Sequence, residues 1–434
     1  MNKTRYLLVL IALHALFFVL AMNFDGIRIP DSYDYIYQAQ NLQEKGSLYA
    51  WTFNEELKPD YFTKRTPGYA VFMVVLFQQG WLILLVQNLL SILVLLRVSE
   101  LILRWTSNKN LAYGLPLILL ALQSNQLLYA NTLISEVLFQ YFVFLALSEL
   151  LLHKQEISVK QFALVSLLFG MALLIKPVLL FFWVPFLVLS AYLAFYRKAW
   201  KYLLPALVMP SLILLWSAHN KTETGWFHYS SISTVNLKDY NTRLTLEAKY
   251  GVEEADKQIA AIQELGEAQG SYAERNRVIK DTCAAIIKSE LGTYAKVHFK
   301  GMLAMLLDPG RYDYVNFFQI TEGESGLMYL LARGDVAGMW DVLKSQSVLV
   351  NVFFFLNLFG SLLLLALALL GLWSLRKELY LFLVIGGFAA YFWVLTGPVG
   401  TARYKSILLP LMLVLAAAGI QFWFTRLKAK KAES

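Results

Sequence analysis

Charge and cysteine are both scarce in this chain of 434 residues. Only 16% of the residues are charged, and Cys283 is the single cysteine. One cysteine excludes an internal disulfide framework and a cysteine-based metal cluster. The sequence contains no His-rich or clustered carboxylate set that would suit a metal, so we expect no required cofactor, and a divalent cation has no support.

Apolar residues are abundant: they make up 58% of the chain, and the mean hydropathy is +0.52. A soluble protein of this length does not need so many long apolar runs, so the composition predicts an all-α, polytopic membrane protein. The formal charge of +8 would suit nucleic acid. However, the basic residues lie in short loops between apolar runs, which is typical of membrane topology, so nucleic acid is set aside as a partner.

Ten segments are apolar enough to span a bilayer as helices. Basic residues precede the first of them, but no small-residue cleavage site follows it, so we expect an uncleaved first helix. Residues 67–79 are also apolar, but they are short and follow Pro67-Gly68, which favours a helix at the interface. The predicted spans lie near 6–23, 81–103, 111–126, 131–152, 162–177, 178–196, 202–219, 347–374, 379–396 and 405–424.

The distribution of lysine and arginine predicts that both termini are cytoplasmic. With that orientation the inner loops carry the basic residues, and the short outer turn around 124–131 carries no charge. Residues 220–345 then lie outside, with an extended stretch followed by amphipathic helical patterns. The predicted units are a transmembrane module at 1–219, whose first outer loop lies at 25–80, this outer segment, and C-terminal helices at 346–434.

Four ionisable residues break the positive-inside pattern near the outer ends of their spans: Glu136, Lys176, Arg403 and Lys405. Each charge costs about 3 kcal/mol to insert, so a functional role is the default hypothesis. Structural explanations stay open: Lys176 can snorkel to the interface, Arg403 and Lys405 can bind lipid head groups, and Glu136 can meet a helix dipole.

Two carboxylates, Asp31 and Asp34, lie at the same level in the first outer loop, which closes with Lys64 and Arg65. A carboxylate at the membrane surface can act as a general base on a lipid-linked substrate. Asp31 as an N-cap with Asp34 in the first turn is the structural alternative. The shared depth and the complementary charges favour a site.

Several short motifs follow one another along the chain. They are Asp31, Tyr35 and Ala39 with Gly46; residues 65–69; Ser135-Glu136; Gly170 through Pro177; Asn220, Gly225, Ser230, Ser231, Asn236 and Leu237; and Ala402-Arg403-Tyr404 with Pro410. In order and spacing, these motifs resemble the GT-C class of membrane glycosyltransferases, close to the branch with protein O-mannosyltransferases and aminoarabinose transferases of lipid A. In one departure, Ser32 follows Asp31 where the family often has two adjacent acids, so a second carboxylate must come from Asp34 or elsewhere.

The resemblance implies transfer of a sugar from a donor carried on a polyprenyl phosphate or diphosphate to a hydroxyl of a glycan, lipid or protein. Direct displacement by that hydroxyl would invert the anomeric centre. The reaction would occur at the outer face of a bacterial cytoplasmic membrane. Asp31 is the first candidate for the base and Asp34 the second. The implied phosphate ligands are Arg403, Lys176, Arg65, Lys64 and Lys405, and the implied substrate contacts are Tyr35, Glu136, Tyr69, Ser231, Asn236 and Tyr404.

Two other functions stay open. A lipid-linked saccharide transporter or flippase would also grip phosphate, but the sequence has no two-fold repeat and no paired broken helices. A polysaccharide polymerase or ligase would instead take a whole glycan from a diphosphate-linked donor.

Overall fold

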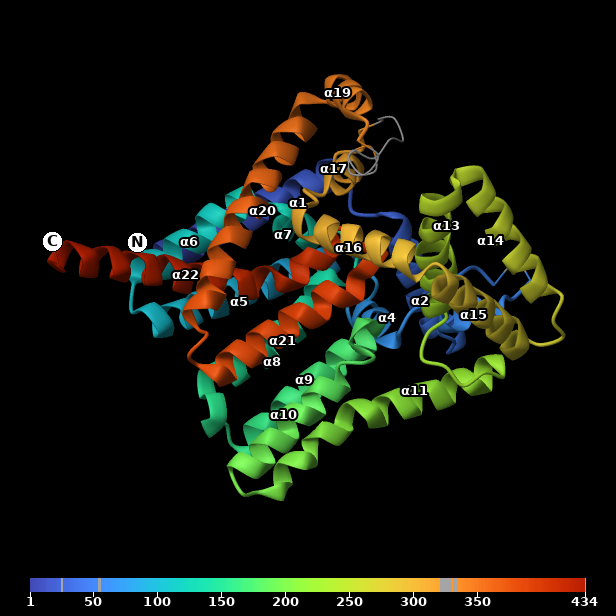
Figure 1. Ribbon diagram of the computed structural model, residues 1–434, viewed down its shortest axis with the longest axis horizontal. Helices are drawn as coiled ribbons and strands as arrows, with labels where there is room; N and C mark the ends of the chain where they lie inside the picture. Colours follow the sequence, from blue (N-terminus) through green and yellow to red (C-terminus); the bar gives the residue numbers. More distant parts are fainter. Residues whose placement is uncertain (25, 54–55, 321–329, 331–333, 434) are drawn as a thin grey trace.

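The computed structural model describes residues 1–24, 26–53, 56–320, 330 and 334–433 (Figure 1). Small parts of the predicted first outer loop at 25–80 and of the outer segment at 220–345 therefore lie outside the described residues. Within the described ranges every regular element is a helix, which confirms the predicted all-α fold.

Each of the ten predicted spans corresponds to a helix. Among the described residues, seven helical stretches are long and apolar enough to cross a membrane, and three shorter apolar helices accompany them. In chain order the helices are α1 (Lys3–Phe24), α5 (Gly80–Thr106), α6 (Lys109–Leu122), α8 (Glu136–His153), α9 (Val159–Ile175), α10 (Trp183–Tyr196), α11 (Val208–Thr224), α20 (Val348–Ser374), α21 (Leu379–Thr396) and α22 (Ala402–Glu433).

Shorter helices build the two segments predicted to lie outside. The first loop contains α2 (Pro30–Lys45), α3 (Pro59–Thr63) and α4 (Pro67–Val75), and α4, at nine residues, is too short to span. The second segment is mainly helical, as predicted: α12 (Ile232–Val235), a π-helix (Asn236–Thr242), α13 (Arg243–Tyr250), α14 (Val252–Glu267), α15 (Tyr272–Ser289), α16 (Leu291–Leu307), α17 (Arg311–Phe317) and α19 (Val336–Ser345).

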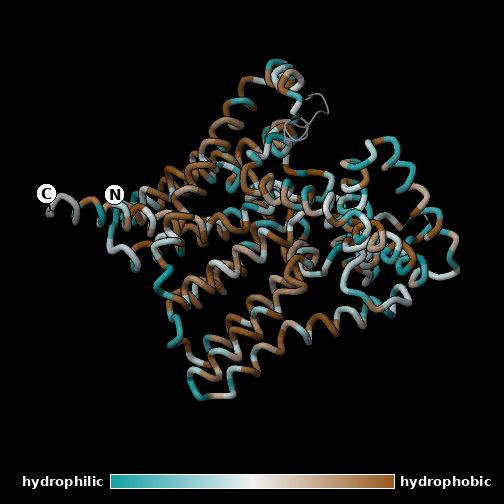
Figure 2. Tube along the Cα trace, viewed as in Figure 1, coloured by the Kyte–Doolittle hydropathy of each residue, from teal (hydrophilic) through white to brown (hydrophobic). Residues whose placement is uncertain are grey.

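The two ends of the bundle differ in character. Both termini and the turns between α5 and α6, α10 and α11, and α20 and α21 lie toward the left and lower left of Figure 1. Helices α13–α15 lie on the opposite side and are largely hydrophilic, whereas the long helices are mostly apolar (Figure 2). This separation is what a membrane-spanning bundle with one large polar segment requires.

One connection differs from its prediction. Residues 124–131 were expected to form a short outer turn, but residues 125–130 form helix α7 (Asn125–Ala130), and all six are buried. The polar side chains that suggest a solvated turn are satisfied inside the protein. Gln123 donates to the carbonyl oxygen of Asn357 at 2.5 Å, and Gln126 donates to Gln140 Oε1 at 2.8 Å. Satisfied amides are the form in which polar side chains tolerate burial.

Helices α8 and α22 form the centre of the bundle. About two-thirds (67%) of the apolar stretch of each is buried, compared with 22% for α1. The first turn of α8 carries Glu136, and the first turn of α22 carries Arg403. The two most enclosed of the seven long helical stretches therefore bring opposite charges to one end of the bundle.

Candidate active site

Helix α2 begins without help from its aspartates. Pro30 is its first residue, where a missing N–H costs nothing, and Ser32 Oγ accepts a hydrogen bond from Ile29 N at 3.0 Å. The N-cap position is Ile29, so the alternative that Asp31 caps the helix is wrong. Asp31 and Asp34 lie three residues apart, on one face of the helix, and both are directed to cations.

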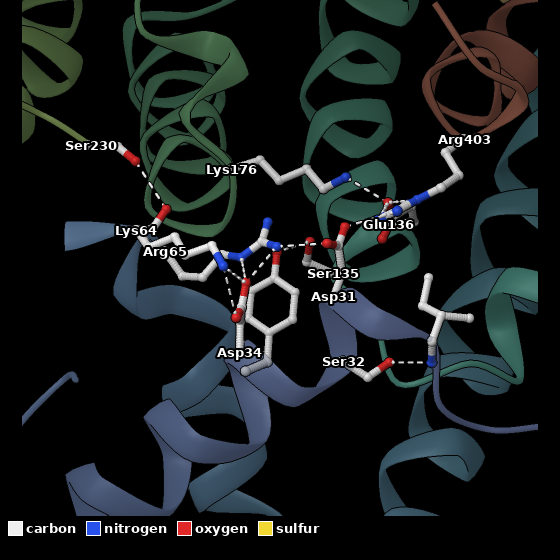
Figure 3. Close-up of polar contacts among 12 residues, drawn as sticks. Asp31, Ser32, Asp34, Lys64, Arg65, Ser135, Glu136, Lys176, Ser230 and Arg403 are labelled. Atoms are coloured by element: carbon white, nitrogen blue, oxygen red, sulfur yellow. Dashed lines mark hydrogen bonds and ion pairs between the residues drawn. The ribbon is translucent and has the colours of Figure 1, made fainter. Parts of the chain in front are cut away.

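Asp31 lies between two arginines (Figure 3). Its Oδ1 accepts from Arg65 Nη2 at 2.9 Å, and its Oδ2 accepts from Arg403 Nη1 at 2.9 Å. Asp34 accepts from Arg65 through Nε at 3.0 Å and Nη2 at 2.8 Å, and from Lys64 Nζ at 3.1 Å. Arg65 therefore bridges the two aspartates, and Arg403 connects Asp31 to the rest of the site.

Glu136 is the second carboxylate that binds the guanidinium group of Arg403. Its Oε1 accepts from Arg403 Nε at 2.9 Å and Nη2 at 2.7 Å, and from Lys176 Nζ at 2.8 Å. The Glu136 side chain is 1% exposed, and its Oε2 is buried without a hydrogen-bond partner in the described part of the chain. Such a carboxylate tolerates burial because two cations compensate its charge.

Seven side chains from distant parts of the sequence thus form one chain of alternating charge, which we call the ion network. Four cations face three carboxylates, so the network carries one net positive charge. It is assembled from α2, the loop before α4, α8, the end of α9 and α22. Its members, in order of contact, are Lys64, Asp34, Arg65, Asp31, Arg403, Glu136 and Lys176.

Aromatic side chains pack against the ion network. The guanidinium of Arg65 lies 5.0 Å from the ring centre of Tyr35, a cation–π distance. The Tyr35 hydroxyl pairs with Ser135 Oγ at 2.9 Å, which ties α2 to the start of α8. Tyr69 packs edge-on against Tyr35 and donates to Gln87 Oε1 at 2.6 Å. Tyr35 and Tyr69 are therefore buried supports of the network.

The protonation state of Asp31 follows from its neighbours. Burial alone would raise the pKa of its carboxyl, but the guanidinium groups of Arg65 and Arg403 outweigh burial and hold that pKa well below its usual range. Asp31 is therefore ionised at neutral pH, and it is a weak base for as long as both arginines hold it.

Lys405 and Tyr404, both predicted to lie at the site, lie in different places relative to the ion network. Lys405 is buried and donates to the main-chain oxygen of Asp308 at 2.8 Å and to Ser361 Oγ at 2.6 Å, so it is not part of the ion network. Tyr404 lies next to the network, with its ring centre 6.0 Å from Lys176 Nζ.

Ser231 and Asn236 make structural contacts. Ser231 is buried and joins the outer segment to α3 through bonds from its Oγ to Asp60 O at 2.8 Å and from its N to Thr63 O at 3.1 Å. Asn236 begins the π-helix, and its main-chain oxygen accepts from Asn241 Nδ2 at 2.8 Å. Neither contacts the ion network in the described interactions.

Sequence reasoning missed two acids of the outer segment that lie close to the network. Asp308 Oδ2 accepts from Ala402 N at 2.8 Å, one residue before Arg403. Asp313 is buried and accepts from the hydroxyl of Tyr129 at 2.6 Å. Charges are ordinary in a long polar segment, so neither acid stands out in the sequence, although Asp308 opens the turn signal Asp308-Pro309-Gly310.

Asp313 yields a stability prediction with a definite sign. Burial raises its pKa to about 7, although Arg403 and the hydrogen bond from Tyr129 oppose the shift. Because the unfolded carboxyl has the lower pKa, stability is lost as the pH rises from about 4 to about 7, by up to about 4 kcal/mol. Asp313→Asn removes this loss, so its melting temperature in detergent should exceed that of the wild type at pH 8 but not at pH 4. A difference in melting temperature between the two proteins that stays the same from pH 4 to pH 8 would contradict the raised pKa of Asp313.

The described residues contain no group of three His, Cys, Asp or Glu side chains placed to hold a metal ion. The carboxylates of the ion network instead face lysine and arginine. The arrangement resembles an anion-binding site in which the protein's own carboxylates accept the hydrogen bonds that a bound anion would otherwise accept.

Fold and site together define a polytopic helical membrane protein with a compensated cation cluster at one end of its bundle. No protein-family model and no curated protein matches the sequence. Among solved structures, the chain is similar to the archaeal oligosaccharyltransferase AglB from Archaeoglobus fulgidus, in complex with an inhibitory peptide and a dolichol-phosphate. The identity is 11%, the TM-score is 0.47, and the match covers 98% of this chain and 51% of AglB. The chain thus spans about half the length of that protein.

A second similar structure is ArnT from Cupriavidus metallidurans bound to undecaprenyl phosphate. It matches at 14% identity and a TM-score of 0.40, over 97% of this chain and 78% of ArnT. Apo ArnT matches at 12% identity and a TM-score of 0.39.

Proposed function

We propose that this protein is a glycosyltransferase that moves a sugar from a polyprenyl-phosphate-linked donor to a hydroxyl group. The acceptor is a glycan, lipid or protein at the outer face of a bacterial cytoplasmic membrane. The observation that carries the proposal is the ion network, in which arginines suited to phosphate are held by carboxylates at the end of an apolar bundle. An isoprenoid chain would lie along the bundle while its phosphate meets these cations.

The charge of the network favours a monophosphate donor. A sugar–phosphate diester carries one negative charge, which matches the one net positive charge of the four cations and three carboxylates. A diphosphate-linked donor would leave excess negative charge in a largely buried site. Guanidinium groups also exchange carboxylate for phosphate readily, because both anions accept bidentate hydrogen bonds.

In the proposed reaction, the donor phosphate takes over hydrogen bonds that Arg403 and Arg65 now give to Asp31. Asp31, released from two guanidinium groups, regains basicity and accepts the proton of the acceptor hydroxyl. The acceptor oxygen attacks the anomeric carbon as the bond from that carbon to the phosphate oxygen breaks. The electron pair remains on the phosphate, where Arg403 and Lys176 stabilise it, and the anomeric centre is inverted.

Asp34 is better placed to hold Arg65 than to act as a base. It is 5% exposed and receives both Lys64 and Arg65, so an acceptor hydroxyl has little access to it. We infer that Asp34 orients Arg65 and that Asp31 is the base. The chemistry calls for no cofactor.

The direct test is sugar transfer by the purified protein from a radiolabelled panel of polyprenyl-phosphate monosaccharides, with and without an extract of mixed acceptors. We expect transfer or slow hydrolysis of one donor. Flux of intact lipid-linked sugar across liposomes without turnover would instead support a flippase. Turnover of diphosphate-linked oligosaccharides alone would support a polymerase or ligase.

A further inference from the structure

The end of α16 and the start of α22 satisfy one another's free backbone groups. Asp308, at the C-cap of α16, accepts from Ala402 N through Oδ2 at 2.8 Å and from Gly310 N through Oδ1 at 2.9 Å. In return, Lys405 from the first turn of α22 donates to the Asp308 main-chain oxygen at 2.8 Å. The first N–H groups and the last C=O groups of a helix lack partners within it. We call this reciprocal arrangement of Asp308, Ala402 and Lys405 the cross-cap.

Close backbone packing makes the cross-cap rigid. A Cβ atom on Gly301 would lie 2.0 Å from Gly397 O, and one on Gly400 would lie 1.9 Å from Gly301 O. Only glycine permits such an approach. Trp393 Nε1 also donates to Met302 O, at 2.9 Å. Helix α16 therefore rests directly on the short segment that leads into α22.

Arg403 is the second residue of α22, next to the capped N–H of Ala402. Its guanidinium must reach Asp31 on one side and Glu136 on the other. The direction of its side chain is set by the backbone of this first turn, which α16 holds in place. A loosened first turn would let the guanidinium leave both partners.

We propose that Asp308 is a positioning residue that holds Arg403 in the geometry required to bind the donor phosphate. The inference rests on the proposed function and extends it, because it makes the outer segment a structural part of the phosphate site. Asp308 acts through the backbone of α22 and does not touch the phosphate.

Positioning and simple electrostatics predict opposite changes in phosphate affinity when Asp308 is replaced, so the direction of the measured change tests the inference. Asp308 is an anion in the neighbourhood of Arg403, so removing its charge alone would strengthen the binding of a phosphate. Loss of positioning would weaken that binding. Asp308→Ala removes both the charge and the cap, whereas Asp308→Asn removes the charge but keeps one oxygen that can accept from Ala402 N.

The experiment measures binding of radiolabelled farnesyl phosphate, a short polyprenyl monophosphate, to the full-length protein in detergent by equilibrium dialysis. We expect Asp308→Ala to weaken binding about tenfold, within the range of measured N-cap losses, and Asp308→Asn to change it less than about threefold. Asp335→Ala is the matched control, since Asp335 caps α19 through Gly338 N at 2.8 Å and does not contact the ion network.

Binding by Asp308→Ala that equals or exceeds that of the wild type would overturn the inference while leaving the proposed function intact. Failure of the wild type to bind farnesyl phosphate would instead count against the proposed function. Affinities are compared per folded protein, as judged by gel filtration. If Asp308→Ala does not fold, Asp308→Glu takes its place, because glutamate keeps the charge while its longer side chain moves the carboxylate away from Ala402 N. Binding by Asp308→Glu that equals that of the wild type would overturn the inference.

Discussion

Asp31→Asn is expected to lower the rate of sugar transfer by about 10²–10⁴-fold, the usual contribution of a general base, while the protein stays folded. Asparagine has the same shape and keeps one oxygen that can accept from an arginine, but it cannot take up the proton of the acceptor hydroxyl. Its effect on folding should be small, because the Asp31 side chain is 37% exposed and partly exposed ion pairs contribute little.

Asp31→Asn should change kcat and the KM for the donor differently. Asp31 now occupies hydrogen bonds of Arg65 and Arg403 that the phosphate would need. A neutral amide competes less well for a guanidinium than a carboxylate does. The KM for the donor should therefore stay constant or fall while kcat collapses. A residue that only shaped the pocket would instead raise KM.

Initial rates at varied donor concentration test both expectations. The matched control is Asp256→Asn, which removes a carboxylate paired with Arg243 at 2.8 Å on the exposed surface of α14 and should leave transfer unchanged. Transfer by Asp31→Asn within about threefold of the wild type would exclude Asp31 as the base. The search would then move to Asp34 and to the buried Asp313.

The ion network could be anticipated largely because charge is costly in a membrane. Glu136, Lys176 and Arg403 stand out in the sequence because each lies where an apolar residue would cost less free energy, and the structure brings all three together. The apolar runs predicted the helices for the same reason. Asp308 and Asp313 gave no such signal, because an acid in a long polar segment carries no visible cost.

Lys405 illustrates a limit of reasoning from depth alone. In the sequence it shares its level and charge with Arg403, two residues earlier. On an α-helix two residues are separated by about 200°, so the two side chains leave opposite sides of α22. Arg403 accordingly faces Asp31 and Glu136, whereas Lys405 faces Asp308 and Ser361. The rotation of a helix about its axis depends on packing that charge spacing does not encode.

Arg403→Met is expected to lower kcat by about 10²–10³-fold, as for other donors that stabilise charge developing in a transition state. Among the described residues, Arg403 is the one cation that joins Asp31 to Glu136. It bonds to Asp31 through Nη1 at 2.9 Å, and to Glu136 through Nε at 2.9 Å and Nη2 at 2.7 Å. Methionine keeps an unbranched apolar side chain but supplies no positive charge for the departing phosphate. Arg104→Met is the matched control, because Arg104 pairs with Glu100 on an exposed helix surface.

Lost activity in Arg403→Met has two physical sources, and a second substitution separates them. Glu136 would keep only Lys176 as its partner while remaining 1% exposed, and leaving a buried charge undercompensated destabilises the fold. Arg403→Lys keeps a positive charge beside Glu136, but its single ammonium group cannot replace the several guanidinium hydrogen bonds that Arg403 gives to Asp31 and Glu136. If Arg403 acts on the phosphate, Arg403→Lys should recover the melting temperature and remain far less active than the wild type. Recovery of transfer together with stability would mean that Arg403 serves only to compensate Glu136.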